Sequence, residues 1–212
     1  MSKKSPKEHY LSEVNLKETN PVLVSLSHLA EKRHIPIIQP EGLAFLKQVI
    51  QLRDIKKILE IGTAIGYSTI GMASVNDTIQ INTIERNQTL FNEAREIIKN
   101  TSYNPQITMH LGDAVEEEFA FNTTFDLIFI DAAKAQNRKL FEKYERFLNP
   151  KGIIIVDNLL FHDMVSTQHT TSRNLRALTR KIDEFNRYII NREDYDTTIY
   201  PIGDGMSLSI KR

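Results

Sequence analysis

Two carboxylates in this sequence stand directly after short apolar runs. Asp131 follows the run 125–130, and Asp157 with Asn158 follows the run 152–156. Short β-branched runs of this kind are typical of central parallel strands that are buried on both faces. Ligands of open α/β sheets bind beyond the carboxyl ends of the strands, so we expect these three polar side chains to meet at one edge. Three oxygen donors there suit Mg²⁺, and Mn²⁺ stays open as the alternative.

A loop with two glycines is expected at the same edge. The predicted strand 57–61 runs into Gly62 and Gly66, and Glu60 stands two residues before the first glycine. A dinucleotide-binding loop would have the spacing G-x-G-x-x-G, and its pyrophosphate would be repelled by the acid. The loop therefore disfavours a nicotinamide oxidoreductase. It suits a cofactor that carries an amino-acid tail and a positive sulfonium.

Acidic residues also mark the ends of the next two predicted strands. Glu85 ends the strand 80–85, where a carboxylate can accept hydrogen bonds from both hydroxyls of a ribose. Asp113 and Ala114 follow the strand 106–111, where an adenine amino group could be recognised. Each acid alone could be a helix N-cap or a solvated loop residue. Acids at three consecutive strand ends favour a cofactor site.

The elements that must position these residues alternate along the chain. We expect strands at 57–61, 80–85, 106–111, 125–130 and 152–156, separated by helices at 67–74, 88–99, 114–118 and 135–148. This alternation predicts an α/β fold with a doubly wound, mostly parallel sheet. A helix at 172–190 and two strands at 195–200 and 205–211 would complete seven strands. The segment Gly203-Asp204-Gly205 predicts a hairpin, so one closing strand should be antiparallel.

The N-terminal quarter has a helical pattern over residues 8–52, which the prolines of 35–40 divide in two. We expect a single domain over 1–212, with a helical extension at 1–52 and a catalytic core at 53–212. The extension is also the surface through which we expect two copies to form a homodimer.

Composition excludes several classes of function. Lysine plus arginine and aspartate plus glutamate both number 27, so net charge gives no sign of nucleic-acid binding and any such surface must be local. The absence of cysteine excludes disulfides and thiolate sites and fits a reducing compartment. No apolar stretch follows the basic N-terminus, and no run approaches the ~20 residues of a membrane span. We expect a soluble, cytoplasmic protein.

Three motifs carry a resemblance to a known family. The segments 58–68, 129–134 and 156–158 resemble the motifs of class I S-adenosylmethionine methyltransferases, within them the metal-dependent O-methyltransferases related to the catechol and caffeoyl-CoA enzymes. The resemblance extends from about residue 20 onward. It implies a Rossmann-like sheet, S-adenosylmethionine as cofactor, and a substrate whose two adjacent oxygens chelate the ion. The residues that it places at the cofactor are Ile38, Glu60, Gly62, Ser68, Glu85, Asp113, Ala114 and Asp131.

Lys134, three residues after Asp131, is the predicted general base. A free lysine with a pKa near 10.4 is a poor base at neutral pH, but a neighbouring cation and partial burial would lower that pKa. The alternative role is a salt bridge to a carboxylate that binds the metal.

The branch that this chain resembles in most detail is the bacterial tRNA 5-hydroxyuridine methyltransferase group. The likeness lies in Ala132-Ala133-Lys134, in the segment 181–186 and in a basic late helix, whereas Ala135 replaces an expected glycine. Arg173, Arg176 and Arg180 share one face of that helix, and they could bind phosphates or form an ordinary solvated face. The resemblance therefore implies O-methylation of 5-hydroxyuridine at the wobble position of tRNA to 5-methoxyuridine.

Two other interpretations compete with the tRNA enzyme. A small-molecule catechol or phenol methyltransferase would need the same chemistry but not the basic helix. A non-catalytic protein that binds S-adenosylmethionine and serves as an RNA scaffold would not need the set Asp131, Asp157, Asn158 and Lys134, since binding alone requires neither metal nor base.

Overall fold

The computed structural model describes residues 6–15, 17–161, 164–167 and 172–212. The α-helices are α1 (Pro6–Val14), α2 (Pro21–Arg33), α3 (Pro40–Leu52), α4 (Tyr67–Ala73), α5 (Gln88–Lys99), α6 (Asn137–Tyr144), α7 (Met164–Thr167) and α8 (Arg173–Ile190). The strands are β1 (Lys57–Ile61), β2 (Gln80–Glu85), β3 (Ile107–Leu111), β4 (Phe125–Ile130), β5 (Leu148–Val156), β6 (Tyr195–Tyr200) and β7 (Met206–Lys211).

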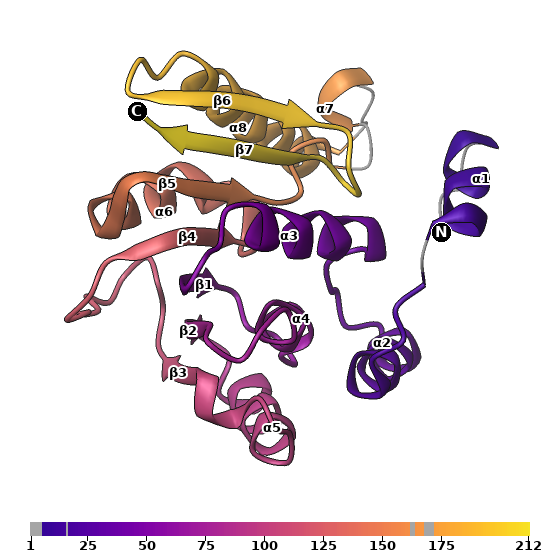
Figure 1. Ribbon diagram of the computed structural model, residues 1–212. Helices are drawn as coiled ribbons and strands as arrows, with labels where there is room; N and C mark the ends of the chain where they lie inside the picture. Colours follow the sequence, from indigo (N-terminus) through magenta and orange to yellow (C-terminus); the bar gives the residue numbers. More distant parts are fainter. Residues whose placement is uncertain (1–5, 16, 162–163, 168–171) are drawn as a thin grey trace.

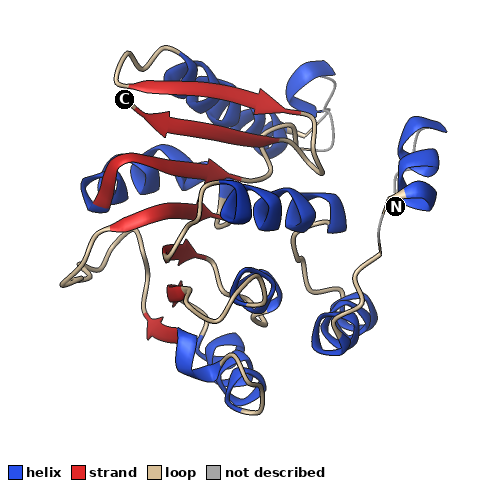
Figure 2. Cartoon of the chain, in the orientation of Figure 1, coloured by secondary structure: helices blue, strands red, loops and turns tan. Residues whose placement is uncertain are grey.

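The seven strands form one sheet in the order β3-β2-β1-β4-β5-β7-β6 (Figures 1 and 2). Strands β1 to β5 pair in parallel, whereas β7 pairs antiparallel with both β5 and β6. The predicted doubly wound, mostly parallel sheet of seven strands is therefore confirmed. The predicted hairpin also forms, because Tyr200 pairs with Met206 across the turn 201–205.

Alternate residues of the strands build two hydrophobic clusters, one on each face of the sheet. Leu127 and Phe129 of β4 belong to the cluster that α2, α3 and α4 complete. Ile128 and Ile130 face the opposite way, into the cluster that α6 and α8 complete. All four side chains are fully buried, as the period of two in a central strand requires when helices cover both faces.

The helices α2 and α3 share the core of the sheet. Leu23 and Leu46 are fully buried in the same cluster as the strands. Each helix begins with a proline at its first turn, where the missing N–H costs nothing, and Asn20 caps α2 by accepting a hydrogen bond from the Val22 N–H at 3.0 Å. The segment 35–39 between them has no regular structure, as its prolines predict.

Two predicted helices differ in the structure. Residues 114–118 form a turn, because the Asp113 carboxylate accepts the Val115 N–H at 2.8 Å and Glu117 folds back onto the Asp113 N–H at 2.8 Å. These are the contacts of a helix start, and the Glu117 N–H also donates to the Asp113 carbonyl at 2.8 Å, but the chain continues in irregular structure after this one turn. The helix expected at 135–148 shortens to α6, flanked by two 3₁₀ turns, because β5 already begins at Leu148, which pairs with Phe125.

The helices of the described segments were also compared with the needs of a membrane span. None of them is both long enough and apolar enough to cross a bilayer.

Candidate active site

The register of the sheet brings the strand-end residues to one level. Ile61 of β1 pairs with Ile84 of β2 and with Ile130 of β4, and Ile130 pairs with Val156 of β5. The residues that come next, Gly62, Glu85, Asp131 and Asp157, therefore lie along the same carboxyl edge of the sheet.

A cavity of about 370 Å³ lies at this edge. This volume is within the range of small-molecule sites, which is roughly 300–1,000 Å³. Nine of the sequence-predicted residues line it: Ile38, Gly62, Ser68, Glu85, Asp113, Ala114, Asp131, Lys134 and Asn158. Glu60, Asp157, Arg173, Arg176 and Arg180 are predicted site residues that are not part of its lining. The structure thus brings most of the predicted cofactor and metal residues together and leaves Glu60, Asp157 and the three arginines outside the lining.

Gly62 is required by the close approach of two strand ends. Its φ is +106°, and a Cβ at this position would lie 2.0 Å from the carbonyl oxygen of Asp131. Only glycine has the necessary freedom there. The loop therefore packs directly against the backbone of Asp131, one of the candidate metal ligands.

The Glu85 carboxylate fastens this loop. It accepts the N–H of Ala64 at 2.8 Å and the N–H of Asn87 at 2.8 Å, and the side chain is buried at the cavity wall. A carboxylate offers about four acceptor positions, so two stay open for hydroxyls of a ligand. Glu85 is thus both part of the wall and a candidate ligand contact, as the sequence predicted.

Glu60 lies behind the loop. Its side chain is fully buried and accepts hydrogen bonds from Ser68 at 2.5 Å, from Thr83 at 2.7 Å and from Thr69. Burial raises the pKa of this carboxyl to about 7, against the three hydroxyl donors. Glu60 does not line the cavity, and its hydrogen bonds support the loop and the start of α4; its contact with a cofactor stays a prediction.

Asp113 and Ala114 form the far wall. The Asp113 carboxylate holds the turn that follows it and lies 3.8 Å from the Arg86 guanidinium. The Ala114 carbonyl accepts the Tyr144 hydroxyl at 3.0 Å. Arg86 and Tyr67 also line the cavity, and sequence reasoning missed both, although Arg86 follows Glu85 directly and Tyr67 follows the second glycine of the loop.

The predicted metal residues are in contact with each other. The Asn158 amide nitrogen donates to the Asp131 carboxylate at 2.9 Å, and the Asn158 N–H donates to the Asp157 carboxylate at 2.7 Å. Asn158 has a φ of +67°, a left-handed conformation that asparagine tolerates better than most residues. This backbone turn directs its amide toward Asp131.

The donor set fits a hard divalent cation. Burial raises the pKa of Asp131, and burial together with the nearby Asp131 charge raises the pKa of Asp157. Two carboxylates that oppose each other's ionisation are a place where a cation is stabilised. No group of three or more acidic, histidine or cysteine side chains in the described residues is arranged to hold a metal ion, and at this site the third oxygen donor is an amide. The residues Asp131, Asp157 and Asn158 would hold such an ion.

Lys134 is placed between these carboxylates and an aromatic ring. It lines the cavity, its charge lowers the pKa of Asp131 against the effect of burial, and its Nζ lies 5.6 Å from the centre of the Phe161 ring. Among the described residues Lys134 makes no ion pair within 4.0 Å, so the choice between a base and a partner of the carboxylates stays a prediction.

The three predicted RNA-binding arginines lie on α8, away from the cavity. All are exposed, and Arg180 pairs with Glu184 at 3.5 Å. One turn further on, Arg187 pairs with Asp183 at 3.0 Å. Acidic partners on the same helix therefore neutralise part of its positive charge.

The known proteins that this chain resembles are described as O-methyltransferases. A family model described as O-methyltransferase matches residues 13–212. A catechol O-methyltransferase from Niastella koreensis is 30% identical and covers 96% of this chain and 95% of its own length. The crystal structure of a proposed caffeoyl-CoA O-methyltransferase from Staphylococcus aureus is 37% identical with a TM-score of 0.92, covering 98% of this chain and all of that one. A structure of an O-methyltransferase from Bacillus cereus in complex with S-adenosylhomocysteine is 26% identical with a TM-score of 0.80, covering 96% of each chain.

Proposed function

The chain belongs to the O-methyltransferase family, and on that premise we propose that it transfers a methyl group from S-adenosylmethionine to one of two adjacent oxygens of a small phenolic substrate. The observation that carries this proposal is the single cavity in which the Glu85 loop adjoins the set Asp131, Asn158 and Lys134. A cofactor site that opens onto a base and a cation site is suited to a group transfer.

The cofactor half of the cavity has features for each part of S-adenosylmethionine, whose sulfonium carries an electrophilic methyl group. Glu85 offers two open acceptor positions for the ribose hydroxyls. Asp113 and Ala114 lie at the far wall, where the adenine would be placed, and the loop Gly62–Ala64 faces the amino-acid end. The net negative charge of Glu85, Asp113 and Asp131 favours a cationic cofactor over a pyrophosphate.

The substrate half has a base and two carboxylates. A divalent ion held by Asp131, Asp157 and Asn158 would lower the pKa of a bound hydroxyl and orient it. Lys134 lies where its Nζ can take the proton of the attacking hydroxyl as the new O–CH₃ bond forms and the S–CH₃ bond breaks, which leaves the thioether S-adenosylhomocysteine. Ile38 and Phe161 provide apolar surface beside the base, which suits a flat aromatic acceptor.

Two observations favour a small acceptor over tRNA. The relatives whose names specify a substrate are catechol and caffeoyl-CoA enzymes. In addition, the arginines of α8 have acidic neighbours, and no residue of α8 lines the cavity. A small phenol needs none of these arginines.

A substrate panel tests the proposal. Methyl transfer from radiolabelled S-adenosylmethionine should be measured with catechol, with a substituted catechol, and with phenol, which lacks the second oxygen. We expect turnover of the vicinal diols, less than about one hundredth of that rate with phenol, and loss of the diol activity in excess chelator. Equal rates with phenol and catechol, or full activity in chelator, would contradict a chelated substrate.

A second candidate is methylation of 5-hydroxyuridine in tRNA, because 4-oxo and 5-hydroxyl groups form the same pair of adjacent oxygens. The observation in its favour is the exposed row Arg173, Arg176 and Arg180. Nucleoside mass spectrometry of tRNA from cells that lack the gene separates the two functions. Accumulated 5-hydroxyuridine with lost 5-methoxyuridine would favour tRNA, and an unchanged nucleoside profile would leave the small phenol.

A further inference from the structure

The turn 114–118 forms part of the cavity wall, yet it lacks the hydrogen bonds that a longer helix would supply. Ala114 and Val115 line the cavity, and the turn is closed by the bond from the Glu117 N–H to the Asp113 carbonyl at 2.8 Å. The last carbonyl groups of a helical turn have no partner within it unless the helix goes on. Because the chain continues here in irregular structure, these carbonyls need donors from another element.

Helix α6 provides these donors. The Tyr144 hydroxyl donates to the Ala114 carbonyl at 3.0 Å. The Lys143 ammonium donates to the carbonyls of Val115 at 3.2 Å and of Glu117 at 2.5 Å. A cation is also favoured at this end of a helical turn, where the carbonyl groups carry partial negative charge. Two adjacent side chains of α6 thus take the place of the missing next turn.

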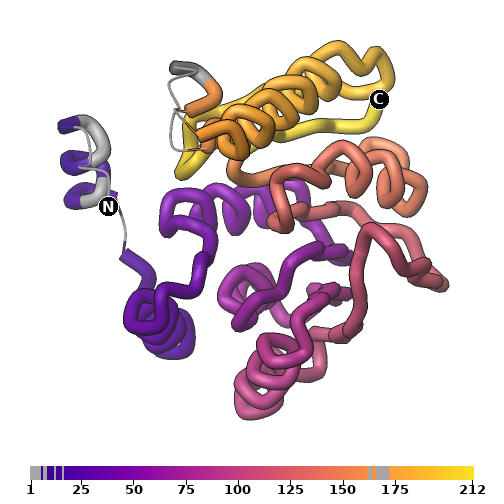
Figure 3. Tube along the Cα trace, turned by 180° about the vertical axis from the view of Figure 1, so that it is seen from behind, coloured from indigo at the N-terminus to yellow at the C-terminus, as the bar shows by residue number. Residues whose placement is uncertain are grey.

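Both donors are fixed by their surroundings. Tyr144 is 1% exposed, and burial raises the pKa of its hydroxyl, which therefore remains a donor. The Lys143 ammonium lies 3.5 Å from the Glu118 carboxylate. Leu140, one turn before Tyr144, is buried and lines the cavity itself. Figure 3 turns toward the reader the face of the sheet that α6 and α8 cover. One side of α6 therefore both forms part of the wall and holds the turn beside it.

We propose that Tyr144 and Lys143 are positioning residues for the adenine end of S-adenosylmethionine, which they serve by holding the backbone of the turn 114–118. Neither side chain lines the cavity, so both act through the turn and not by contact with the ligand. The inference rests on the proposed function, which places the adenine at this wall. Changes at these two positions should therefore weaken binding of the adenine and leave the base and the cation site at the other end unaffected.

Calorimetric titration with S-adenosylhomocysteine tests Tyr144. Tyr144→Phe removes the hydroxyl and keeps the ring in the core, and it should raise the Kd by about 3- to 10-fold, the factor that corresponds to one lost neutral hydrogen bond. The Kd of 5′-methylthioadenosine should rise by the same factor, because this ligand keeps the adenine and lacks the amino-acid end. At saturating S-adenosylmethionine, kcat and the KM for catechol should stay within about twofold of wild type.

Tyr195→Phe is the matched control. Tyr195 is 2% exposed in the same hydrophobic cluster, but it lies on β6, and its hydroxyl makes no hydrogen bond to the cavity wall in the described part of the chain. This control should keep the wild-type Kd for both ligands. If Tyr144→Phe lowers only the free energy of unfolding and leaves both Kd values unchanged, the proposal is overturned and Tyr144 is a core residue alone. A Kd raised for S-adenosylhomocysteine but not for 5′-methylthioadenosine would also overturn it, since the effect would then lie at the amino-acid end.

A second pair of variants tests Lys143 by itself. Lys143→Met keeps the apolar stem and removes both donated hydrogen bonds, so the Kd of both ligands should rise at least about threefold. Lys139→Met is its control, because Lys139 is an exposed lysine of the same helix. Wild-type affinity in Lys143→Met would overturn the role of Lys143. A wild-type protein that binds neither ligand would instead contradict the proposed cofactor site, an outcome distinct from binding that neither variant changes.

Discussion

Asp131 and Asp157 are like charges in contact with one asparagine, so each resists ionisation of the other until a cation is present. Burial of the two carboxylates raises their pKa values, because a buried negative charge must be neutralised by a proton, a hydrogen-bond donor or a metal ion. Asn158 supplies such a donor to Asp131. The negative charge of Asp131 and Asp157 is therefore only partly neutralised by the residues around them.

The metal residues lead to the first prediction. Asp157→Asn removes one charge of the proposed ion site and should lower kcat by at least about 100-fold, the scale of the loss when a metal ligand or its support is changed. In metal-free buffer the same variant should be as stable as the wild type or more stable, because a repulsive charge is gone. A methyl-transfer assay measures kcat, and a urea titration measures the free energy of unfolding. A variant with normal turnover would remove Asp157 from the site.

Glu85 leads to the second prediction. Glu85→Ala should weaken binding of S-adenosylmethionine by roughly 1.5–3 kcal/mol, the contribution of a charge-assisted hydrogen bond. Isothermal titration calorimetry measures this loss. Glu85→Gln is the control, since it keeps an oxygen for the Ala64 and Asn87 N–H groups and should retain part of the affinity. Unchanged affinity in Glu85→Ala would show that the ribose lies elsewhere.

Glu60 leads to the third prediction, which concerns pH. Its folded-state pKa of about 7 lies above the ordinary value of 4.5, so the folded state holds the proton more tightly than the unfolded state. The stability from this group is present below pH 4.5 and is lost as the pH rises toward 7. Relative to the wild type, Glu60→Gln should therefore gain about 3 kcal/mol between these two pH values and no more above them. Urea titrations in chelator at several pH values test this, and a constant difference would contradict it.

At the scale of the elements, two helices on the same sheet have different tasks. The N-terminus of α4 follows the glycine loop and lies over Glu60, whereas α8 packs Ile182, Phe185 and Ile189 against the opposite face and leaves its basic side in solvent. Of these two helices, α4 lines the cavity through Tyr67 and Ser68, and no residue of α8 does. Changes on the exposed side of α8 should thus be separable from changes in the cavity.

This separation gives the fourth prediction. The triple variant Arg173→Gln, Arg176→Gln, Arg180→Gln should leave kcat and KM for a small catechol within about twofold of wild type, because the residues lie outside the cavity. If tRNA is a substrate, its KM should rise and the log–log salt slope should fall by about 0.7–0.9 for each lost phosphate contact. A variant that loses both activities together would indicate misfolding, and one that changes neither would identify this helix face as an ordinary solvated surface.

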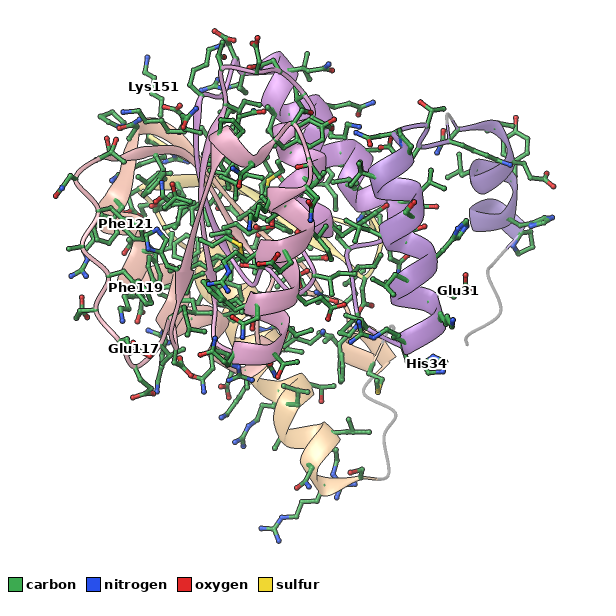
Figure 4. All side chains as sticks on the ribbon, turned by 90° about the horizontal axis from the view of Figure 1, so that it is seen from below. Glu31, His34, Glu117, Phe119, Phe121 and Lys151 are labelled. Carbon is green, nitrogen blue, oxygen red and sulfur yellow. The ribbon has the colours of Figure 1, made fainter. Side chains whose placement is uncertain are left out.

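The loop between β3 and β4 contains a cluster of aromatic contacts. Phe119 and Phe121 stack with ring centres 6.4 Å apart, and His110 meets Phe121 edge-on at 5.4 Å. Figure 4 shows both phenylalanines on the same side of the molecule as Glu117. The aromatic contacts hold the loop against the edge of the sheet, so Asp113 at its start keeps its place at the cavity.

At the scale of the whole molecule, ligands bind where several segments far apart in the sequence converge. The cavity is lined from residue 36 to residue 158, so a ligand there ties together both halves of the sheet. Binding to the folded state alone stabilises it by RT ln(1 + [L]/Kd).

The fifth prediction follows from this linkage. S-adenosylmethionine at 100 times its Kd should stabilise the fold by about 2.7 kcal/mol, which for a chain of this size raises the Tm by roughly 5–10 °C. Differential scanning fluorimetry measures the shift. Glu85→Ala should show a clearly smaller shift at the same concentration. The absence of any shift in the wild type would contradict a cofactor site in this cavity.

Much of the fold and the site follows from local sequence alone. The apolar runs before Glu85, Asp131 and Asp157 identify the strands, and the alternation with helices makes the strands parallel, so their carboxyl ends must share an edge. The glycine loop could also be located from the sequence, because Gly62 and Gly66 follow the predicted strand 57–61, whereas the contact with Asp131 that requires a glycine at position 62 appears only in the structure. The acids at the strand ends can be predicted because the residues of a strand alternate regularly and because neighbouring parallel strands end at the same edge of the sheet.

The tertiary structure alone decided the remainder. Glu60 lies under the loop because its place in the alternation of β1 turns it toward Ser68 and Thr83, which only the packed fold brings near. The segment 114–118 stops after one turn although Asp113 caps it like the start of a helix, and the sequence pattern does not show where the chain turns away. The apolar pattern of α1 likewise does not tell which surface it meets. Each of these features depends on where the chain goes in three dimensions, which the helical and strand periods of the sequence do not show.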